Sequence, residues 1–478
     1  MASASELHNA GHRLALWNRS PDMLKPLQVH DGVGFTGAMG AGNLYLLPHA
    51  KRPVGAVRSK AGTTYSGKAG MTKLLLKNAN ILDVVAGRLI GEHDVLIADG
   101  RIREIDHGLS HNSARQIDLA GRTLMPGLCD AHVHAAAPMN SFAELECLSP
   151  SYVAIRSAKV LEGMLLRGFT TVRDGGGADF GLARAVDEGF VTGPRLLYCG
   201  KALSQTGGHG DMRQPGQLAR DAHPYVPGLG QICDGVDAVR RAVREEIRRG
   251  AHHIKLMVGG GIASPSDPID QDQFSKEEIL AAVEEAECAN RYVMVHSYAN
   301  RSVARAVQCG ARSIEHANFL DDKTAQIIRE HQAHVVPTLA IFHVMVKEGL
   351  EIGISPRVHA INKHVLEHGM RALEVARRNQ VSLAYGTDLS GQLHIHQSVE
   401  FSLRAEVFSP ADLLRQATVN AAELFRMADR IGKVAVGFEA DLIGIDGDPL
   451  ERIGVLQEQG RHIDLIIKGG SVIKAQLN

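Results

Sequence analysis

The sequence predicts an α/β protein in which a (β/α)₈ TIM barrel is joined to a small β-sandwich. Over residues 126–428, short apolar runs alternate with amphipathic helical patterns. Short strands separated by Gly and Asp turns lie on both sides of this region, in 71–125 and 429–478. His, Lys and Asp residues stand where the apolar runs end, and a barrel gathers its functional groups at the carboxyl ends of its strands.

The composition is that of an ordinary globular protein with room for several domains. The 478 residues carry a net charge of −1 and are 44% hydrophobic, so no basic excess attracts nucleic acid or anionic membranes. No apolar run of about 18 residues could span a bilayer, and the first residues do not resemble a secretory signal. The six cysteines form no CxxC pair, which favours reduced thiols and a cytoplasmic location.

The first 70 residues form an irregular, glycine-rich extension. Within it, 4–27, "ASELHNAGHRLALWNRSPDMLKPL", resembles the start of β-hydroxyacid dehydrogenases. The glycine loop that would hold a pyrophosphate is absent and no βαβ unit follows, which disfavours a nicotinamide-dependent dehydrogenase. We expect 1–70 to be a fused remnant or an over-extended start, with Met71 opening the functional enzyme.

The β-sandwich is predicted from two distant stretches of similar character. The first, within 71–125, reads "MTKLLLKNANILDVVAGRLIGEHDVLIADGRIREID". The second, within 429–478, contains "ADLIGIDGDPL" and "IDLIIKGGSVIK". Both alternate apolar and polar residues between turns, so one sandwich built from both stretches is expected.

The barrel is predicted from eight apolar runs with helical patterns between them. One helix, over 275–290, opens with Ser275 as N-cap and Glu278 three residues on, which is a capping box. An open doubly wound sheet would also fit the alternation, but functional residues at the ends of several strands favour the barrel. The predicted strands are 124–130, 170–174, 195–200, 252–257, 292–297, 313–317, 334–339 and 382–388.

The stretch "CDAHVH" suggests a metal site at the end of the first run. Alternate residues of a strand face the same side, so His132 and His134 would point together. A lone strand-end histidine is more often a satisfied polar residue, and an aspartate in "GTD" is often a helix N-cap. The argument therefore depends on the whole set of strand-end residues: His132, His134, Lys255, His296, His316 and Asp388.

This combination over 71–478 resembles the amidohydrolase superfamily. The resemblance implies that His132 and His134 bind one divalent metal ion, that His296 and His316 bind a second, and that Lys255 bridges both as a carbamate. Asp388 would ligate the first ion and act as the catalytic base and acid. Mixed nitrogen and oxygen ligands suit zinc. A metal-bridging hydroxide would then attack the scissile carbonyl.

Four longer motifs resemble one branch of that superfamily, the prolidase and arginine-carboxypeptidase-like enzymes. This branch is related to imidazolonepropionase and includes ochratoxin-hydrolysing amidohydrolases. The resemblance implies cleavage of the amide bond that precedes a C-terminal amino acid with a free carboxylate, in dipeptides, N-acyl amino acids or ochratoxin-like amides. It also implies a homo-oligomer, for which an octamer is one form. The motifs are "SQTGGHGD" (204–211), "KLMVGGGIASP" (255–265), "HSYANRSV" (296–303) and "HIHQSVEF" (394–401).

Three residues are candidates to bind the substrate carboxylate: His209, Tyr298 and Arg173. Alternatively, they are a turn histidine, a packed tyrosine and half of a local Arg173–Asp174 ion pair. The second HxH, His394-Ile395-His396, is expected to be structural or part of a substrate loop, and His253 to pack in the interior.

Two other functions stay open at this point. A cyclic-amide hydrolase of the imidazolonepropionase, hydantoinase or dihydroorotase type would use the same metals to open a ring. A non-catalytic scaffold with this fold would have lost its ligands, and the filled ligand positions argue against it.

Overall fold

The computed structural model of the chain describes residues 73–214, 216–217 and 227–477. The extension 1–70, including the dehydrogenase-like segment 4–27 and the expected start at Met71, lies outside the described residues. No helix in the described part of the chain is long and apolar enough to cross a membrane.

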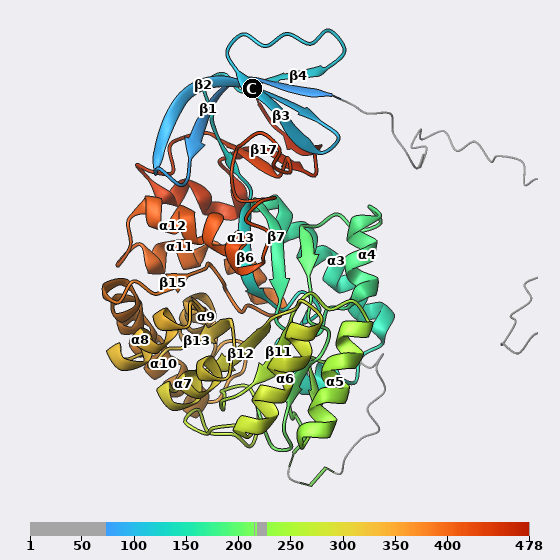
Figure 1. Cartoon of the computed structure of the whole chain (residues 1–478), viewed down its shortest axis with the longest axis vertical. Coiled ribbons are helices and arrows are strands. Elements are labelled where there is room, and N and C mark those ends of the chain that lie inside the picture. Colours follow the sequence, from blue (N-terminus) through green and yellow to red (C-terminus); the bar gives the residue numbers. More distant parts are fainter. Residues whose placement is uncertain (1–72, 215, 218–226, 478) are drawn as a thin grey trace, which may run out of the picture. The chain divides into compact units, whose positions relative to one another are not determined.

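An eight-stranded sheet combines strands from both sides of the central region, in blue and red at the top of Figure 1. Its order is β18-β17-β16-β5-β1-β2-β3, with β4 paired to β1. The link between the two stretches is the antiparallel pair β16 and β5, in which Ile443 pairs with Met125. The strands are β1 (Leu74–Asp83), β2 (Arg88–Ala98), β3 (Arg101–Asp106), β4 (Arg115–Asp118), β5 (Thr123–Pro126), β16 (Leu442–Ile445), β17 (Ile463–Lys468) and β18 (Ser471–Ala475).

Two parallel sheets form the interior of the central region. One has the order β6-β7-β8 and the other β10-β9-β11-β12-β13-β14-β15. Every residue of β6, β7, β11, β12 and β13 is buried, as expected for parallel strands covered on both faces. The strands are β6 (Leu128–Val133), β7 (Phe169–Asp174), β8 (Arg195–Leu197), β9 (Ala202–Ser204), β10 (Gly230–Ile232), β11 (Ile254–Met257), β12 (Val293–Ser297), β13 (Ser313–His316), β14 (His334–Val336) and β15 (Ser382–Leu383).

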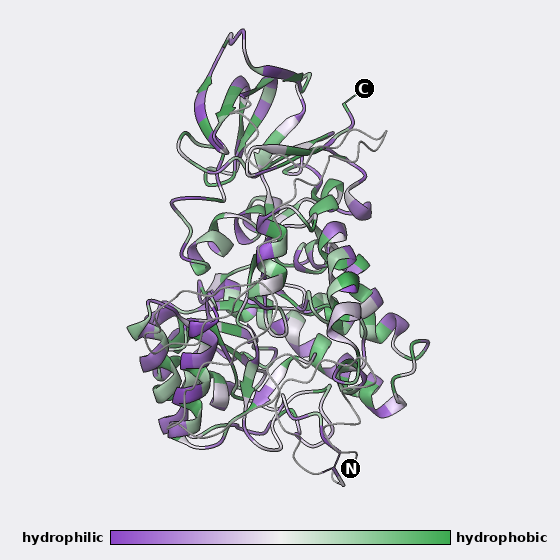
Figure 2. Cartoon of the chain, turned by 90° about the vertical axis from the view of Figure 1, so that its right-hand side faces the viewer, coloured by the Kyte–Doolittle hydropathy of each residue, from purple (hydrophilic) through white to green (hydrophobic). Residues whose placement is uncertain are grey.

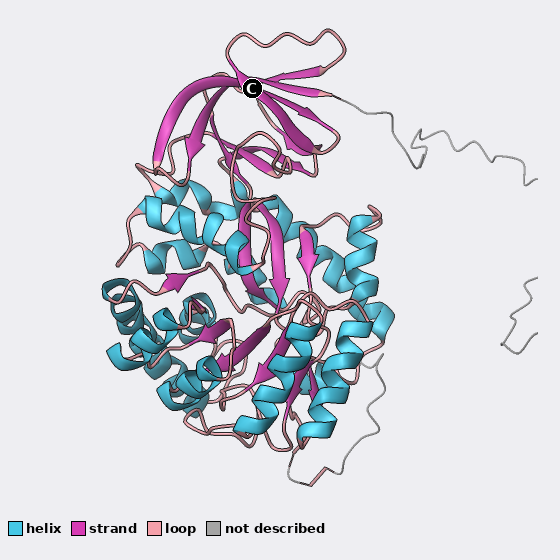
Figure 3. Ribbon diagram, viewed as in Figure 1, coloured by secondary structure: helices cyan, strands magenta, loops and turns pink. Residues whose placement is uncertain are grey.

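Helices surround these parallel strands (Figure 3), and hydrophilic residues line their outward sides (Figure 2). The capping box predicted at Ser275 and Glu278 is confirmed at the start of α6. The helices are α2 (Phe142–Leu145), α3 (Pro150–Leu166), α4 (Phe180–Asp187), α5 (Val236–Arg248), α6 (Lys276–Cys288), α7 (Asn300–Gln308), α8 (Asp322–Glu330), α9 (Leu339–Glu348), α10 (Pro356–Arg378), α11 (Val399–Arg404), α12 (Pro410–Gln416) and α13 (Val419–Leu424), with 3₁₀ turns η1 (Gly391–His396), η2 (Ile453–Leu456) and η3 (Glu458–Gly460).

Backbone hydrogen bonds link the two parallel sheets at two places. After β8, the carbonyl of Tyr198 accepts a hydrogen bond from His252 N at 2.9 Å, just before β11. At the second place, Ala131 N in β6 donates to the carbonyl of Tyr385 at 2.7 Å, just after β15. The α/β class is therefore confirmed, and the strand ends that carry the candidate ligands converge.

The expected first strand, 124–130, is in fact two strands in two different sheets. Gly127 separates β5 from β6, and its N–H donates to the carbonyl of Asp441 at 2.8 Å. A Cβ at this position would lie 2.2 Å from Thr170 Oγ1, so only glycine allows this close approach. Several other expected strands are shorter in the structure, and 334–339 ends early because helix α9 begins at Leu339.

Candidate active site

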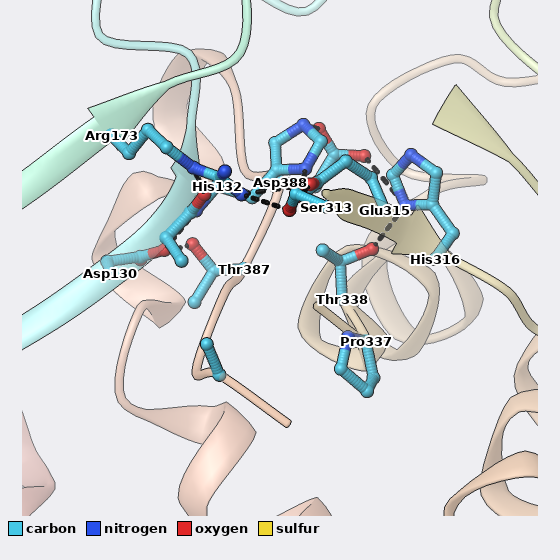
Figure 4. A network of polar contacts seen from close by, with 12 residues as sticks. Asp130, His132, Arg173, Ser313, Glu315, His316, Pro337, Thr338, Thr387 and Asp388 are labelled. Carbon is cyan, nitrogen blue, oxygen red and sulfur yellow. Dashed lines mark hydrogen bonds and ion pairs between the residues drawn. The ribbon is translucent and has the colours of Figure 1, made fainter. Parts of the chain in front are cut away.

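Four of the expected ligands meet where β6, β13 and β15 end. Because alternate residues of β6 face one side, His132 and His134 both present Nε2 to Asp388 Oδ1, at 3.2 and 3.0 Å. Asp388 follows β15, and its Oδ2 lies 3.9 Å from Nδ1 of His316 at the end of β13. Figure 4 shows His132, His316 and Asp388 around one point. Ligand atoms of these three residues lie within 4.8 Å of one another, which is close enough to hold a metal ion.

Lys255 on β11 and His296 on β12 complete the predicted set. The ring centroids of His296 and His316 are 4.6 Å apart, and Lys255 is 1% exposed. All six predicted ligands line one cavity of about 460 Å³, a size typical of small-molecule sites.

Each of the four imidazoles uses one ring nitrogen for a protein contact. Nδ1 of His132 donates to Glu315 Oε2 at 2.7 Å, and Nδ1 of His134 lies 3.2 Å from the carbonyl of Gly176. Nε2 of His296 lies 3.1 Å from the carbonyl of Gly260, and Nδ1 of His316 lies 2.7 Å from Thr338 Oγ1. In each ring the other nitrogen is left to ligate, which is the usual arrangement of metal-binding histidines.

The electrostatic environment favours neutral imidazoles at His296 and His316 and an ionised carboxylate at Asp388. Burial lowers the pKa of His296 and of His316 well below the ordinary value. Neighbouring cationic groups lower that of His296 further, whereas Asp388 partly offsets the shift of His316. Burial alone would raise the pKa of Asp388, but the adjacent His132 and His134 hold it well below its usual range. For His296, His316 and Asp388, these are the protonation states that metal ligation requires. Burial alone would lower the pKa of His134, but the adjacent Asp388 raises it above the ordinary value.

Two of the predicted ligands have left-handed backbone conformations. The φ of His316 is 76° and that of Asp388 is 58°. A non-glycine residue in this region carries strain of about 1–2 kcal/mol, and such positions cluster at functional sites. The N–H of Asp388 donates to the carbonyl of His132 at 2.8 Å, which fixes the turn against β6.

Glu315 is a functional residue that the sequence analysis missed. It is fully buried on β13, where its carboxylate accepts hydrogen bonds from His132, Arg173 Nη2 at 2.8 Å and Ser313 Oγ at 2.5 Å. Burial alone would raise its pKa, but Arg173 and then His132 lower it far below the usual range. The available signal was a lone carboxylate inside the apolar run "SIEHA".

Arg173, a candidate to bind the substrate carboxylate, lies in the interior behind the candidate ligands. It is fully buried behind the site, paired with Glu315, and its Nε donates to the carbonyl of Ala131 at 2.7 Å. It is not among the described residues that line the cavity. Nor does it pair with Asp174, whose carboxylate accepts backbone N–H groups of Ala135, Gly176 and Ala178.

Asp130, also missed, connects the two strand ends that carry the first ligands. Its carboxylate accepts from Thr387 Oγ1 at 2.7 Å, from Gln397 Nε2 at 2.9 Å and from the N–H of His132 at 3.1 Å. Burial raises its pKa to about 6 even though these donors lower it. Asp130 thereby holds the turn at Thr387 and Asp388 against β6.

His209 and Tyr298 line the cavity on either side of His296. His209 stacks on His296 with ring centroids 4.1 Å apart, and its Nδ1 lies 3.3 Å from Asp267 Oδ2. The ring of Tyr298 lies 5.2 Å from that of His316, and burial raises its pKa well above the usual value. Tyr298 is therefore a hydrogen-bond donor over the whole physiological pH range.

The remaining histidines of interest do not line the cavity. His253 is fully buried, stacks on Tyr292 at 5.6 Å and lies 3.1 Å from the carbonyl of Asp174, in keeping with packing. His394 is buried in η1, and Nε2 of His396 lies 3.0 Å from Glu348 Oε1.

Comparisons with known proteins agree with this geometry. Residues 123–472 match the model of the Amidohydrolase family. The chain is 31% identical to an ochratoxinase from Aspergillus niger over 364 residues, covering 73% of this chain and 75% of that protein. A prolidase structure complexed with N-methylphosphonate-L-proline is 44% identical, with a TM-score of 0.82 over 85% of this chain and all of that one. A Xaa-Pro dipeptidase structure with bound methionine is 28% identical, with a TM-score of 0.76 over 84% of this chain and all of that one.

Proposed function

The chain belongs to the amidohydrolase family, in its prolidase- and ochratoxinase-like branch, and is a hydrolase of amide bonds; from this premise we propose which bond it cleaves. The bond is the amide that precedes a C-terminal amino acid with a free carboxylate, in a dipeptide or an N-acyl amino acid. The observation that carries the proposal is one cavity lined by all six candidate ligands together with His209 and Tyr298. The bound proline phosphonate and methionine of the two structural relatives support such a substrate.

We also propose that the parallel strands close into one barrel, with the domain boundaries given below. The eight strands would be β6, β7, the combined β8 and β9, β11, β12, β13, β14 and β15. The backbone hydrogen bonds of Tyr198 and Ala131 between the two sheets support closure. The barrel would occupy 126–428, with the sandwich formed by 71–125 and 429–478.

The donor set fits two divalent metal ions, with zinc as the expected metal. His132, His134, His296, His316, Asp388 and a carbamylated Lys255 would hold them. When bound, such ions lower the pKa of a water molecule and polarise a carbonyl oxygen. Burial lowers the pKa of Lys255, which enlarges the neutral fraction of the amine that reacts with CO₂.

Residues of this chain would transfer the proton and bind the substrate carboxylate. Asp388, held ionised by the adjacent imidazoles, would accept the proton of the attacking water and return it to the leaving amine. The Tyr298 hydroxyl would donate a hydrogen bond to the substrate carboxylate. His209, aligned by Asp267 at 3.3 Å, would supply a second donor when protonated.

A substrate panel tests this function. The panel contains Ala-X dipeptides, N-acyl amino acids, ochratoxin A and cyclic amides, assayed with zinc and bicarbonate, and His134→Ala is the matched control. We expect amino-acid release that disappears in the control and after chelation, and that returns when zinc is added. Turnover of a cyclic amide alone would instead place the chain among the ring-opening enzymes.

A further inference from the structure

The cavity has two unlike ends on either side of the candidate metal ligands. At one end, an apolar lobe is formed by α9, the loop after it and α10, and we call it the α9–α10 lobe. At the other end, Phe142 of α2 lies with its ring 6.2 Å from that of His134. The lobe is lined by Ile341, Phe342, Met345, Ile354 and Val358, with Asn362 at its edge.

Among the described residues, the lobe offers no partner for a charged side chain. Asp388 is the one carboxylate among the described residues that line the cavity, and it is engaged with His132 and His134. The cationic or titratable nitrogens there belong to the candidate ligands and to His209. Asn362, the polar residue of the lobe, is buried and donates from Nδ2 to the carbonyl of Val358 at 2.9 Å. An arginine, lysine or glutamate side chain in the lobe would therefore lose hydration without gaining an ion pair.

The position of Tyr298 indicates which part of the substrate enters the lobe. Its ring lies between that of His316, at 5.2 Å, and that of Phe342, at 5.9 Å. A carboxylate bound at Tyr298 is one bond away from the Cα that carries the C-terminal side chain. That side chain therefore starts beside Phe342, while the acyl group continues past Asp388 towards His134 and Phe142.

We propose that the site selects bulky apolar C-terminal residues, whose side chain fills the α9–α10 lobe, and that the acyl group packs against Phe142. This inference rests on the proposed function and adds its substrate class. The flexible side chain of Met345 in the lobe adapts to different apolar shapes. The lobe therefore accepts leucine, methionine and phenylalanine side chains.

The first test is the C-terminal preference of the zinc-loaded full chain. We expect kcat/KM for Ala-Leu, Ala-Met and Ala-Phe to exceed that for Ala-Ser, Ala-Arg, Ala-Lys and Ala-Glu by about tenfold or more, since burying such side chains is worth at least that factor. Equal or faster release of a basic or small residue would overturn this inference alone. Release from none of the dipeptides would overturn the proposed function and this inference with it.

A matched pair of variants tests the orientation. Met345 and Phe142 are both only partly buried, so Met345→Glu and Phe142→Glu each add one carboxylate at opposite ends of the cavity. Met345→Glu should raise the kcat/KM ratio of Ala-Arg to Ala-Leu about tenfold or more, because an ion pair becomes available in the lobe. Phe142→Glu should leave that ratio unchanged and raise the ratio of Lys-Leu to Ala-Leu.

The reverse pattern, or no change in either ratio, would overturn the assigned orientation. Ile354→Glu, at another partly buried lobe position, provides a second lobe variant if Met345→Glu does not fold. Circular dichroism and metal content of each variant confirm that the ratios refer to folded, loaded protein.

Discussion

At the residue scale, the orientation of His132 depends on a carboxylate behind the cavity. Glu315 accepts the Nδ1 hydrogen of His132 at 2.7 Å, so the neutral ring keeps its Nε2 lone pair on the side of Asp388. Arg173 holds Glu315 in place from the opposite side at 2.8 Å. A partner of this kind raises the basicity of a metal-binding histidine and fixes its tautomer.

Glu315→Gln should therefore reduce both stability and metal retention. The neutral amide leaves Arg173 as a buried cation without its ion pair, which costs about 3–5 kcal/mol. Removing such a partner typically weakens metal affinity about 10–100-fold. Thermal unfolding and metal content after dialysis against a mild chelator measure the two effects.

The exposed Glu330→Gln serves as the matched control and should behave like the parent protein. A Glu315→Gln protein with unchanged metal retention would show that Glu315 serves the packing of Arg173 only.

At the scale of single elements, β14 contains a buried histidine. Within the described part of the chain neither ring nitrogen of His334 has a hydrogen-bond partner, and the residue is buried at the amino end of the strand. Burial, together with the nearby Arg312 and Arg173, lowers its pKa from 6.5 to about 4. The unfolded chain therefore binds more protons than the folded chain between these two pH values, so stability rises with pH across that window.

His334→Leu should flatten this dependence. Relative to the parent, the variant should gain up to about 3 kcal/mol of stability as the pH falls from 6.5 to 4, because its unfolded chain no longer takes up a proton that the folded chain excludes. Urea unfolding at several pH values within that window gives the difference. His331→Leu, at an exposed position nearby, is the control, and an equal effect there would contradict the account.

The turn after β7 is a second element on which the site depends. A Cβ at Gly175 would lie 2.8 Å from His132 Nε2 and 3.4 Å from His134 Cε1. Gly175 does not have a positive φ, so alanine fits its backbone conformation and the cost arises from contact with the two rings. Gly175→Ala should consequently weaken metal binding with little loss of fold.

Titration of the metal-free variant with zinc, followed by calorimetry, measures that effect. Gly454→Ala is the matched control, since the closest atom to its Cβ would be 3.9 Å away. Zinc affinity unchanged in Gly175→Ala would mean that the two rings can shift without losing the metal.

At the scale of the whole molecule, the features that could be predicted from the sequence are those that local patterns encode, namely the strands and the residues at their ends. The apolar runs and the residues at their ends were sufficient to gather the six candidate ligands, because parallel strands bring their carboxyl ends together. Glu315, Asp130 and the true position of Arg173 were not predictable in this way. Their roles depend on which strands become neighbours and on which side chains meet behind the cavity. Gly127 divides one apolar run between two sheets for a similar reason, since the close contact with Thr170 depends on the pairing of β6 with β7.

The eight-stranded sheet leads to a prediction about the extension. β1 begins at Leu74 and pairs with β2, β4 and β5, and its residues Leu74, Leu75 and Leu76 are buried. Every described strand of this sheet lies after Met71. A protein that starts at Met71 should therefore unfold at the same temperature as the full chain and release amino acids at the same rate.

A matched protein that starts at Asn80 lacks these three leucines and should fail to fold, at a cost of about 1.5–3 kcal/mol for each buried side chain. Thermal unfolding and amino-acid release compare the three proteins, and loss of either property on starting at Met71 would show that residues 1–70 belong to the functional enzyme.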